Sequence, residues 1–140
     1  MPTLLDLADI PIPAAVEGIS VADGARGAEF CGRDTTFIHN TCPFIDPIPE
    51  WRGVRTTRYT YARTLQGPWM LYDNEADPYQ MNNLVDTPQM QEIQKSLDDA
   101  VYDWLQEIGD DFQPREVYWE RHGFDVNEVG HIKITEENGI

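Results

Sequence analysis

Four arginines stand close together in the middle of a strongly acidic chain: Arg52, Arg55, Arg58 and Arg63. The chain has 140 residues and a formal net charge of -15, so this basic cluster is exceptional within it. A guanidinium group binds sulfate, phosphate and carboxylate oxygens with the same planar fork. Two interpretations stay open: the arginines line the approach to an anionic substrate, or they pair with Asp and Glu as scaffold. We favour scaffold, with Arg52 and Arg55 as the better functional candidates.

Three carboxylates alternate along a turn-prone segment, at Asp73, Glu75 and Asp77. Alternating carboxylates are typical of calcium loops, but an EF-hand loop needs Gly at its sixth position and Glu at its twelfth. Pro78 and Leu84 occupy those positions here. We therefore expect a structural loop, in which side-chain oxygens accept hydrogen bonds from nearby backbone amides.

The histidines and cysteines are scattered along the chain. His39, His122 and His131 have no i, i+4 pair of the kind that binds metal. Only His39 is kept as a candidate for contact with an anionic substrate. Cys31 and Cys42 leave two alternatives open, a disulfide in an oxidising compartment or two free thiols. The sequence predicts no catalytic and no metal-binding residue.

Composition restricts the class of protein. The excess of carboxylates disfavours nucleic acid and anionic membranes as partners, because their phosphates would be repelled. No apolar run approaches the roughly 20 residues of a membrane span, and no signal peptide is recognised at the start; localisation stays open. Four Trp, six Tyr and five Phe indicate a folded core, while ten Pro and ten Gly indicate many turns. A loop-rich α+β domain is expected.

The arginines lie on segments that alternate with the two-residue period of half-buried strands. We expect two antiparallel hairpins between residues 51 and 72, with Tyr59, Tyr61 and Trp69 on one aromatic face, and one more strand at 35–39. The clearest helix is predicted over 87–108, with one apolar stripe, Thr87 as N-cap and Gly109 after its last turn. The predicted fold is a small antiparallel sheet of about three to four strands covered by this long helix, with a loop-rich N-terminal extension.

Two stretches carry a family resemblance. WRGVRTTRYTYAR followed by PWMLYDNEADPYQMNNL, within residues 51–84, resembles the C-terminal subdomain of the type I sulfatases, in the alkaline-phosphatase-like superfamily. MPTLLDLADIPIPAAVEGIS, residues 1–20, resembles the segment that closes the sulfatase catalytic domain. Gln80 stands where the family usually has Glu, and Asp9 where it usually has Gly. The two segments occur in the family's order, and together they cover roughly the first four-fifths of the chain.

The resemblance implies four regions: the end of the catalytic domain (1–27), a linker (28–50), a sheet-plus-helix subdomain (51–112) and a tail (113–140). It also implies that the reactive centre lies upstream. A sulfatase needs a formylglycine made from Cys or Ser in a C/S-x-P-x-R setting, and a divalent metal, calcium or magnesium. Cys31 and Cys42 lack that setting, so this chain alone is expected to be inactive.

The function implied is therefore that of a C-terminal fragment of a sulfuric ester hydrolase. It would complete the fold beside an upstream catalytic domain and help shape access for a sulfated small molecule or glycan, near His39, Arg52 and Arg55. Two alternatives stay open. One is a free-standing, non-enzymatic interaction module. The other is the C-terminal part of a related phosphodiesterase or phosphonate hydrolase, which shares this architecture.

Overall fold

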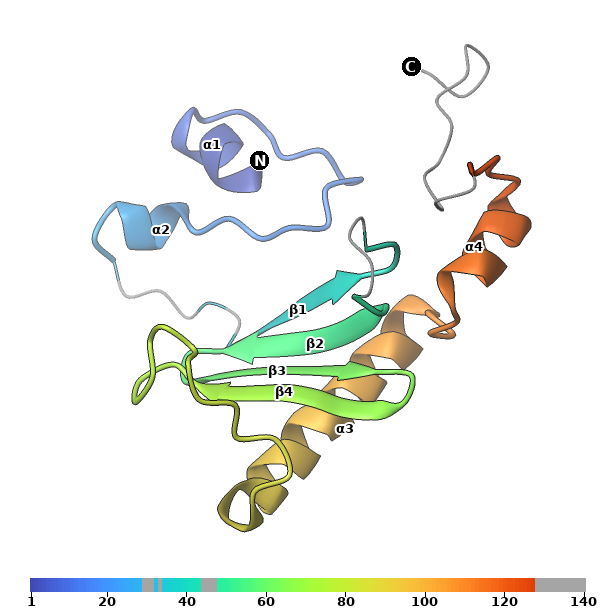
Figure 1. The fold of residues 1–140 in the computed structure, drawn as a ribbon. Coiled ribbons are helices and arrows are strands. Elements are labelled where there is room, and N and C mark those ends of the chain that lie inside the picture. Colours follow the sequence, from blue (N-terminus) through green and yellow to red (C-terminus); the bar gives the residue numbers. More distant parts are fainter. Residues whose placement is uncertain (29–31, 33, 44–47, 128–140) are drawn as a thin grey trace. The chain divides into compact units, whose positions relative to one another are not determined.

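The computed structural model describes residues 1–28, 32, 34–43 and 48–127. The chain divides into two compact units, Met1–Asp34 and Thr35–Ile140, and each is described here by itself. The second unit holds the predicted sheet and helix (Figure 1).

Four strands form one antiparallel sheet, in the order β1-β2-β3-β4. They are β1 (Thr35–Asn40), β2 (Trp51–Thr56), β3 (Tyr59–Thr64) and β4 (Gly67–Asp73). Each strand pairs with its neighbour in sequence, so the two predicted hairpins and the predicted strand near 35–39 are confirmed. Because β1 pairs with β2 along its whole length, the unit that holds the sheet begins at Thr35 rather than at Trp51, inside the segment predicted to be a linker.

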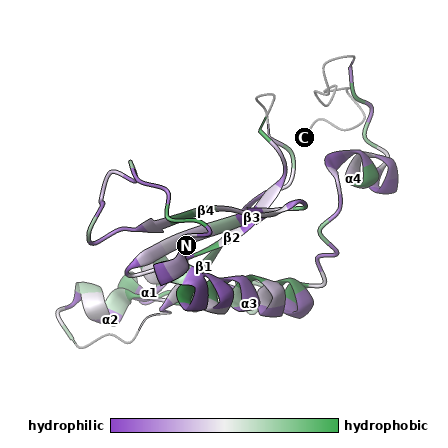
Figure 2. Ribbon diagram, turned by 60° about the horizontal axis from the view of Figure 1, so that its bottom comes forward, coloured by the Kyte–Doolittle hydropathy of each residue, from purple (hydrophilic) through white to green (hydrophobic). Residues whose placement is uncertain are grey.

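The helix α3 (Gln91–Ile108) lies across one face of the sheet, where it contacts β2 and β3 (Figure 1). Leu97, Val101 and Leu105 recur every four residues and face the sheet, and hydrophobic and hydrophilic residues alternate along the helix in Figure 2. The core comprises Val54, Tyr61, Leu71, Leu97, Val101, Leu105 and Phe112. Each large apolar side chain buried in this way stabilises the fold by roughly 1.5–3 kcal/mol. The predicted α+β fold is confirmed.

The two ends of α3 differ from the expected pattern in detail. The α-helix follows a short 3-10 turn, η1 (Pro88–Met90). The Thr87 hydroxyl donates to the Leu84 carbonyl and does not cap the helix. At the other end Gly109 adopts the left-handed conformation expected after a last helical turn, with φ 68°.

Two side chains are not buried under α3 as predicted: Ile108 of the apolar helix stripe and Trp69 of the aromatic sheet face. Ile108 is 51% exposed, because helical periodicity continues past the part of α3 that the sheet covers. Trp69 is absent from the described core under α3, and its ring lies 6.5 Å from that of Trp51. A register irregularity between Ala62 and Arg63, opposite Trp69, interrupts the alternation from which its position was predicted.

On the outer edge of β4, the side chain of Asn83 forms hydrogen bonds with backbone groups of the strand. The carboxamide oxygen of Asn83 accepts a hydrogen bond from the Leu71 backbone N–H at 2.9 Å, and its nitrogen donates to the Trp69 carbonyl at 3.0 Å. The carboxamide thus replaces the peptide group of a fifth strand. The Leu84 N–H then donates to the Leu71 carbonyl at 2.8 Å. The loop after β4 therefore satisfies edge groups that would otherwise attract another chain.

The first unit contains two short helices, α1 (Pro2–Leu7) and α2 (Ala22–Ala25). Arg26 joins them by donating to the Asp6 side chain at 3.2 Å and to the Asp6 carbonyl at 3.0 Å. Hydrogen bonds from Ser20 and Arg26 lower the pKa of Asp6. Large apolar side chains remain exposed in this unit: Leu4, Leu7, Ile10, Ile12, Ile19 and Val21.

A further helix, α4 (Arg115–His122), comes after α3 along the chain, in a region for which the sequence predicted no element. The Arg115 guanidinium donates to the Glu50 carboxylate and to the Pro43 carbonyl, which ties α4 to the segment before β2. The sequence also suggests a last edge strand near Ile132 and Ile134, but these residues lie outside the described part of the chain, as does Cys31. Among the helices that the structure describes, none is both long and apolar enough to span a membrane.

Candidate functional site

Arg52 is fully buried on the face of β2 that α3 covers. Its Nε donates to Asp110 Oδ2 at 2.6 Å, one Nη donates to the Tyr118 hydroxyl at 3.2 Å, and the other donates to the Trp51 carbonyl at 3.1 Å. The guanidinium carbon lies 4.6 Å from the centre of the Phe112 ring. Burial raises the pKa of the Asp110 carboxyl, but hydrogen bonds from Arg52, the Phe112 N–H and Tyr118 outweigh it and the pKa is lowered. These contacts favour the scaffold interpretation for Arg52.

His39 lies beside Arg52, because the two residues are register partners on neighbouring strands and so share a face of the sheet. The His39 side chain is exposed, and its ring stacks on that of Phe37 at 5.4 Å between centroids. Phe37 in turn stacks on Trp104 of α3 at 5.3 Å. Stacking on Phe37 therefore holds the exposed His39 imidazole in place on β1, an edge strand of the sheet.

Arg55 lies on the opposite face of the sheet. It is three residues from Arg52, and side chains alternate between the faces with a period of two. The Arg55 side chain is exposed, and its Nη1 donates to the hydroxyl of Thr60, its register partner, at 2.9 Å. The sheet thus brings His39 and Arg52 together and separates both from Arg55. The three residues therefore do not share one face of the sheet, and their role in substrate access stays a prediction.

The other two arginines of the cluster pair with carboxylates, as the scaffold interpretation expects. Arg58 Nη2 lies 2.8 Å from Asp73 Oδ2, and Arg63 Nη1 lies 2.8 Å from Asp98 Oδ2. The hydrogen bond from Arg58 lowers the pKa of Asp73 and raises that of Arg58. The Tyr61 hydroxyl donates to Asp98 at 2.6 Å, and burial followed by this bond raises the pKa of Tyr61.

The alternating carboxylates of the loop after β4 bind backbone amides. Asp73 Oδ1 accepts from the N–H groups of Glu75 and Ala76, at 3.1 and 3.2 Å, and Asp77 Oδ2 accepts from Asn82 N–H at 2.7 Å. The structural interpretation of this loop is therefore confirmed. Within the ranges that the structure describes, no group of three or more His, Cys, Asp or Glu side chains could hold a metal ion. The carboxylates of the loop do not fit the metal that the resemblance implies.

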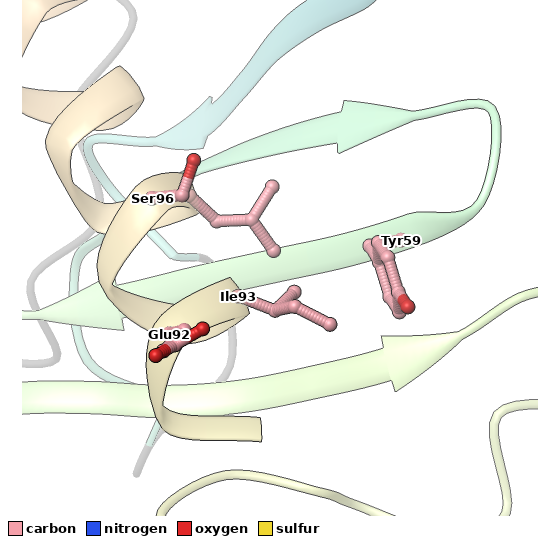
Figure 3. Close-up of a pocket in the computed structure, with 5 residues that line it drawn as sticks. Tyr59, Glu92, Ile93 and Ser96 are labelled. Carbon is pink, nitrogen blue, oxygen red and sulfur yellow. The ribbon is translucent and has the colours of Figure 1, made fainter. Parts of the chain in front are cut away.

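A shallow pocket of about 330 Å³ lies between β3 and the first half of α3, lined by Tyr59, Glu92, Ile93, Ser96 and Leu97. In Figure 3, Ile93 projects from the helix toward Tyr59, and Glu92 and Ser96 lie on the same helix. This lining is mostly apolar and contains no nucleophile paired with a base, which is what an acid–base or covalent mechanism requires. The pocket is a gap in packing at the helix start rather than a catalytic centre.

Sequence reasoning missed the polar partners that fix the arginines. Asp110 and Tyr118 bind Arg52 from positions 58 and 66 residues away, and no local pattern connects them. Asn74 and Gln80, which surround Thr60 beside Arg55, lie in a loop that the sequence identified only as polar and turn-prone. Gln80 has a positive φ of 54°, and the sequence carries no signal for this conformation.

The comparisons with known proteins agree with this architecture. The family model described as "N-sulphoglucosamine sulphohydrolase, C-terminal" matches residues 1–107. An ulvan-active sulfatase from Formosa agariphila is 36% identical over 126 residues, which are 89% of this chain and 25% of the relative. The chain belongs to the type I sulfatase family, of which it carries the C-terminal part. It spans about a quarter of the length of that relative.

Two solved structures extend the comparison. A 2-O GAG sulfatase has a TM-score of 0.70 and 26% identity, over 94% of this chain and 29% of that one. The phosphonate monoester hydrolase of Agrobacterium radiobacter has a TM-score of 0.54 and 17% identity, over 96% of this chain and 28% of that one. At that identity the second likeness concerns the fold alone. The C-terminal architecture is therefore common to sulfatases and a phosphonate hydrolase.

Proposed function

We propose that this chain is the C-terminal part of a sulfuric ester hydrolase whose reactive centre lies in a part of the protein outside these residues. In that enzyme the chain completes the fold and helps shape access for a sulfated substrate. The observation that carries the proposal is the family match over residues 1–107, which includes both the helical N-terminal unit and the sheet with α3. The ulvan-active relative is about four times as long as this chain, so it contains a large part that these 140 residues lack.

The exposed apolar side chains of the first unit support the proposal that another part of the protein packs against it. Leu4 is 70% exposed and Ile10 is 51% exposed, on a unit built from short helices. Several exposed large apolar side chains in one small unit are consistent with a surface that another part of the protein covers. We assign residues 1–27 to the end of the catalytic domain and propose that this domain covers them.

The three access candidates receive different roles in the proposal. Arg55 is exposed and keeps guanidinium N–H groups available beyond its bond to Thr60, so it is the best suited to contact an anionic substrate. His39 is exposed at the edge of the sheet and is a second candidate. Arg52 is buried and bonded to Asp110, so its proposed contribution is to hold the scaffold.

In the intact enzyme a divalent metal and a formylglycine residue would supply the nucleophile and the charge stabilisation at the sulfate ester. The residues described here do not fit that metal, and no step of the reaction is assigned to them. The substrate class to test first is a sulfated polysaccharide, since a 36% identical relative is an ulvan-active sulfatase. A phosphonate or phosphate ester is the second candidate, because a phosphonate monoester hydrolase shares the fold.

The test compares the chain alone with the protein encoded by the whole gene. Sulfate release from sulfated oligosaccharides and phosphonate release from a phosphonate monoester are measured for both. We expect no turnover by residues 1–140 and metal-dependent sulfate release by the whole protein. Turnover by the chain alone, or a whole gene without an upstream hydrolase part, would contradict the proposal. Preference for the phosphonate ester would select the second candidate.

A further inference from the structure

Arg55 differs from the other basic residues of the chain. Every lysine and arginine that the structure describes lies within 4.0 Å of a carboxylate oxygen in an ion pair, apart from Arg55. This is unexpected in a chain with 25 Asp and Glu residues against 10 Lys and Arg. The partner of Arg55 is instead a neutral hydroxyl, that of Thr60. The cation therefore keeps its charge uncompensated at the surface.

The polar cluster around Arg55 is rich in donors and poor in acceptors. The Thr60 hydroxyl accepts from Arg55 Nη1 at 2.9 Å and from Gln80 Nε2 at 3.1 Å, and donates to Asn74 Oδ1 at 2.9 Å. Gln80 Nε2 also lies 2.9 Å from Asn74 Oδ1. The Asn74 Nδ2 group is buried and has no acceptor among the described residues. A guanidinium carries five N–H donors, so a group that supplies negatively charged acceptors is what this cluster lacks.

The cluster is held in place before any ligand arrives. Thr60 is only 7% exposed and lies directly opposite Arg55 in the β2–β3 register. Asn74 follows β4 at once, and its N–H donates to the Arg58 carbonyl at 2.6 Å. Asp73, the carboxylate directly before Asn74, is occupied by Arg58 and by backbone amides. Preorganised donors bind with little further loss of conformational freedom.

We propose that Arg55, supported by Thr60, Asn74 and Gln80, forms a binding site for an oxyanion, namely a sulfate group. Charge-assisted hydrogen bonds from a guanidinium to such oxygens are about twice as strong as neutral ones. The sulfate is either a free ion or a group carried by a sugar, and both present the same oxygens. The site deepens the access role proposed for Arg55, but its existence does not depend on catalysis by the intact enzyme.

The test is a titration of the 15N-labelled 140-residue chain, with ionic strength kept constant by chloride. Sodium sulfate, a monosulfated hexose and the corresponding neutral hexose are added in separate experiments, and the backbone amide shifts of Thr60 and Asn74 are followed. We expect saturable shifts with at least one of the two sulfates and none with the neutral hexose. Binding of sodium sulfate identifies a site for the free ion. Binding of the sulfated hexose alone identifies a saccharide site.

Two variants and one control decide the assignment. Arg55→Gln removes the cation, and Gln80→Glu leaves the arginine in place but adds a carboxylate beside the same hydroxyl. Each should weaken binding by about tenfold or more, as loss of a charged hydrogen bond predicts. Arg121→Gln, which removes a cation paired with Asp111 elsewhere, should leave binding unchanged. Near-UV circular dichroism checks that each variant is folded, and Gln80→Glu keeps the test valid if Arg55→Gln does not fold.

Three results would overturn the site. They are an absence of saturable binding with either sulfate, equal binding of the neutral hexose, and binding that survives in a folded Arg55→Gln or Gln80→Glu variant. Because no turnover is measured, these results would leave the proposed hydrolase function standing. Conversely, a whole protein without sulfatase activity would not remove a site that binds sulfate in this titration.

Discussion

The pair formed by Arg52 and Asp110 should be among the most consequential polar contacts for stability. Arg52→Leu keeps an apolar side chain in the interior but leaves Asp110, whose side chain is 14% exposed, without its cation. Removing one partner of a buried ion pair costs about 3–5 kcal/mol. A domain of this size has a total stability of roughly 5–15 kcal/mol. The variant should therefore unfold at a much lower urea concentration than the wild type.

The neighbouring pair supplies a matched control. Arg121 and Asp111 also form an Arg–Asp ion pair, but their side chains are 46% and 45% exposed. Water and salt screen such a pair, so Arg121→Leu should leave the urea midpoint close to that of the wild type. A double variant, Arg52→Leu with Asp110→Leu, removes both buried charges and should recover much of the stability lost by Arg52→Leu alone.

The pH dependence gives an independent check with a defined sign. The folded-state pKa of Asp110 is lowered from its ordinary value of 3.8, so this carboxylate contributes stability above that value and loses it as the pH falls through the lowered pKa. Without Arg52, burial still raises the pKa of Asp110 but fewer hydrogen bonds oppose it, so this pKa should be higher than in the wild type. The stability difference between wild type and Arg52→Leu should therefore shrink as the pH falls from neutral through 3.8 and on through the lowered pKa of Asp110. A loss below about 1 kcal/mol, or a difference independent of pH, would refute this account.

Three further changes test the fold. Leu97→Ala should cost about 2–5 kcal/mol in urea unfolding, because it opens a cavity under α3; an unchanged midpoint would contradict the assigned core. Gly53→Ala should prevent correct pairing of β2 and β3, seen as lost near-UV circular dichroism, because a Cβ at Gly53 would lie 2.3 Å from the Tyr61 carbonyl oxygen. Asn83→Leu should expose the β4 edge and promote association, which light scattering would detect; a variant that stays monomeric at high concentration would argue against the edge-cap role.

Local patterns were sufficient for the four strands and for α3, but not for α4. The two-residue alternation around Val54 and Tyr61 predicted the hairpins, and the four-residue steps from Leu97 to Leu105 predicted α3. These periods follow from backbone geometry, so one sequence reveals them. The same alternation failed at Trp69, because a register irregularity interrupts it and the sequence gives no sign of where such an irregularity falls.

The candidate site was less predictable than the fold. The arginine cluster was recognised as mainly scaffold, but the partners of each arginine come from distant segments or from the folded loop after β4. Asp110 meets Arg52 only because the chain beyond α3 returns to the sheet. The contrast between Arg52 and Arg55 requires knowledge of which face α3 covers. The cluster of arginines in the sequence therefore pointed to the right strand, β2. It did not show which arginine of that strand is exposed and which is buried.

The two arginines of β2, Arg52 and Arg55, make different contributions to folding. Arg52 is buried in an ion pair with Asp110, whereas the guanidinium of Arg55, three positions later, donates to one neutral hydroxyl among the residues that the structure describes. A substitution at position 52 therefore removes a buried ion pair, whereas a substitution at position 55 removes one hydrogen bond at the surface.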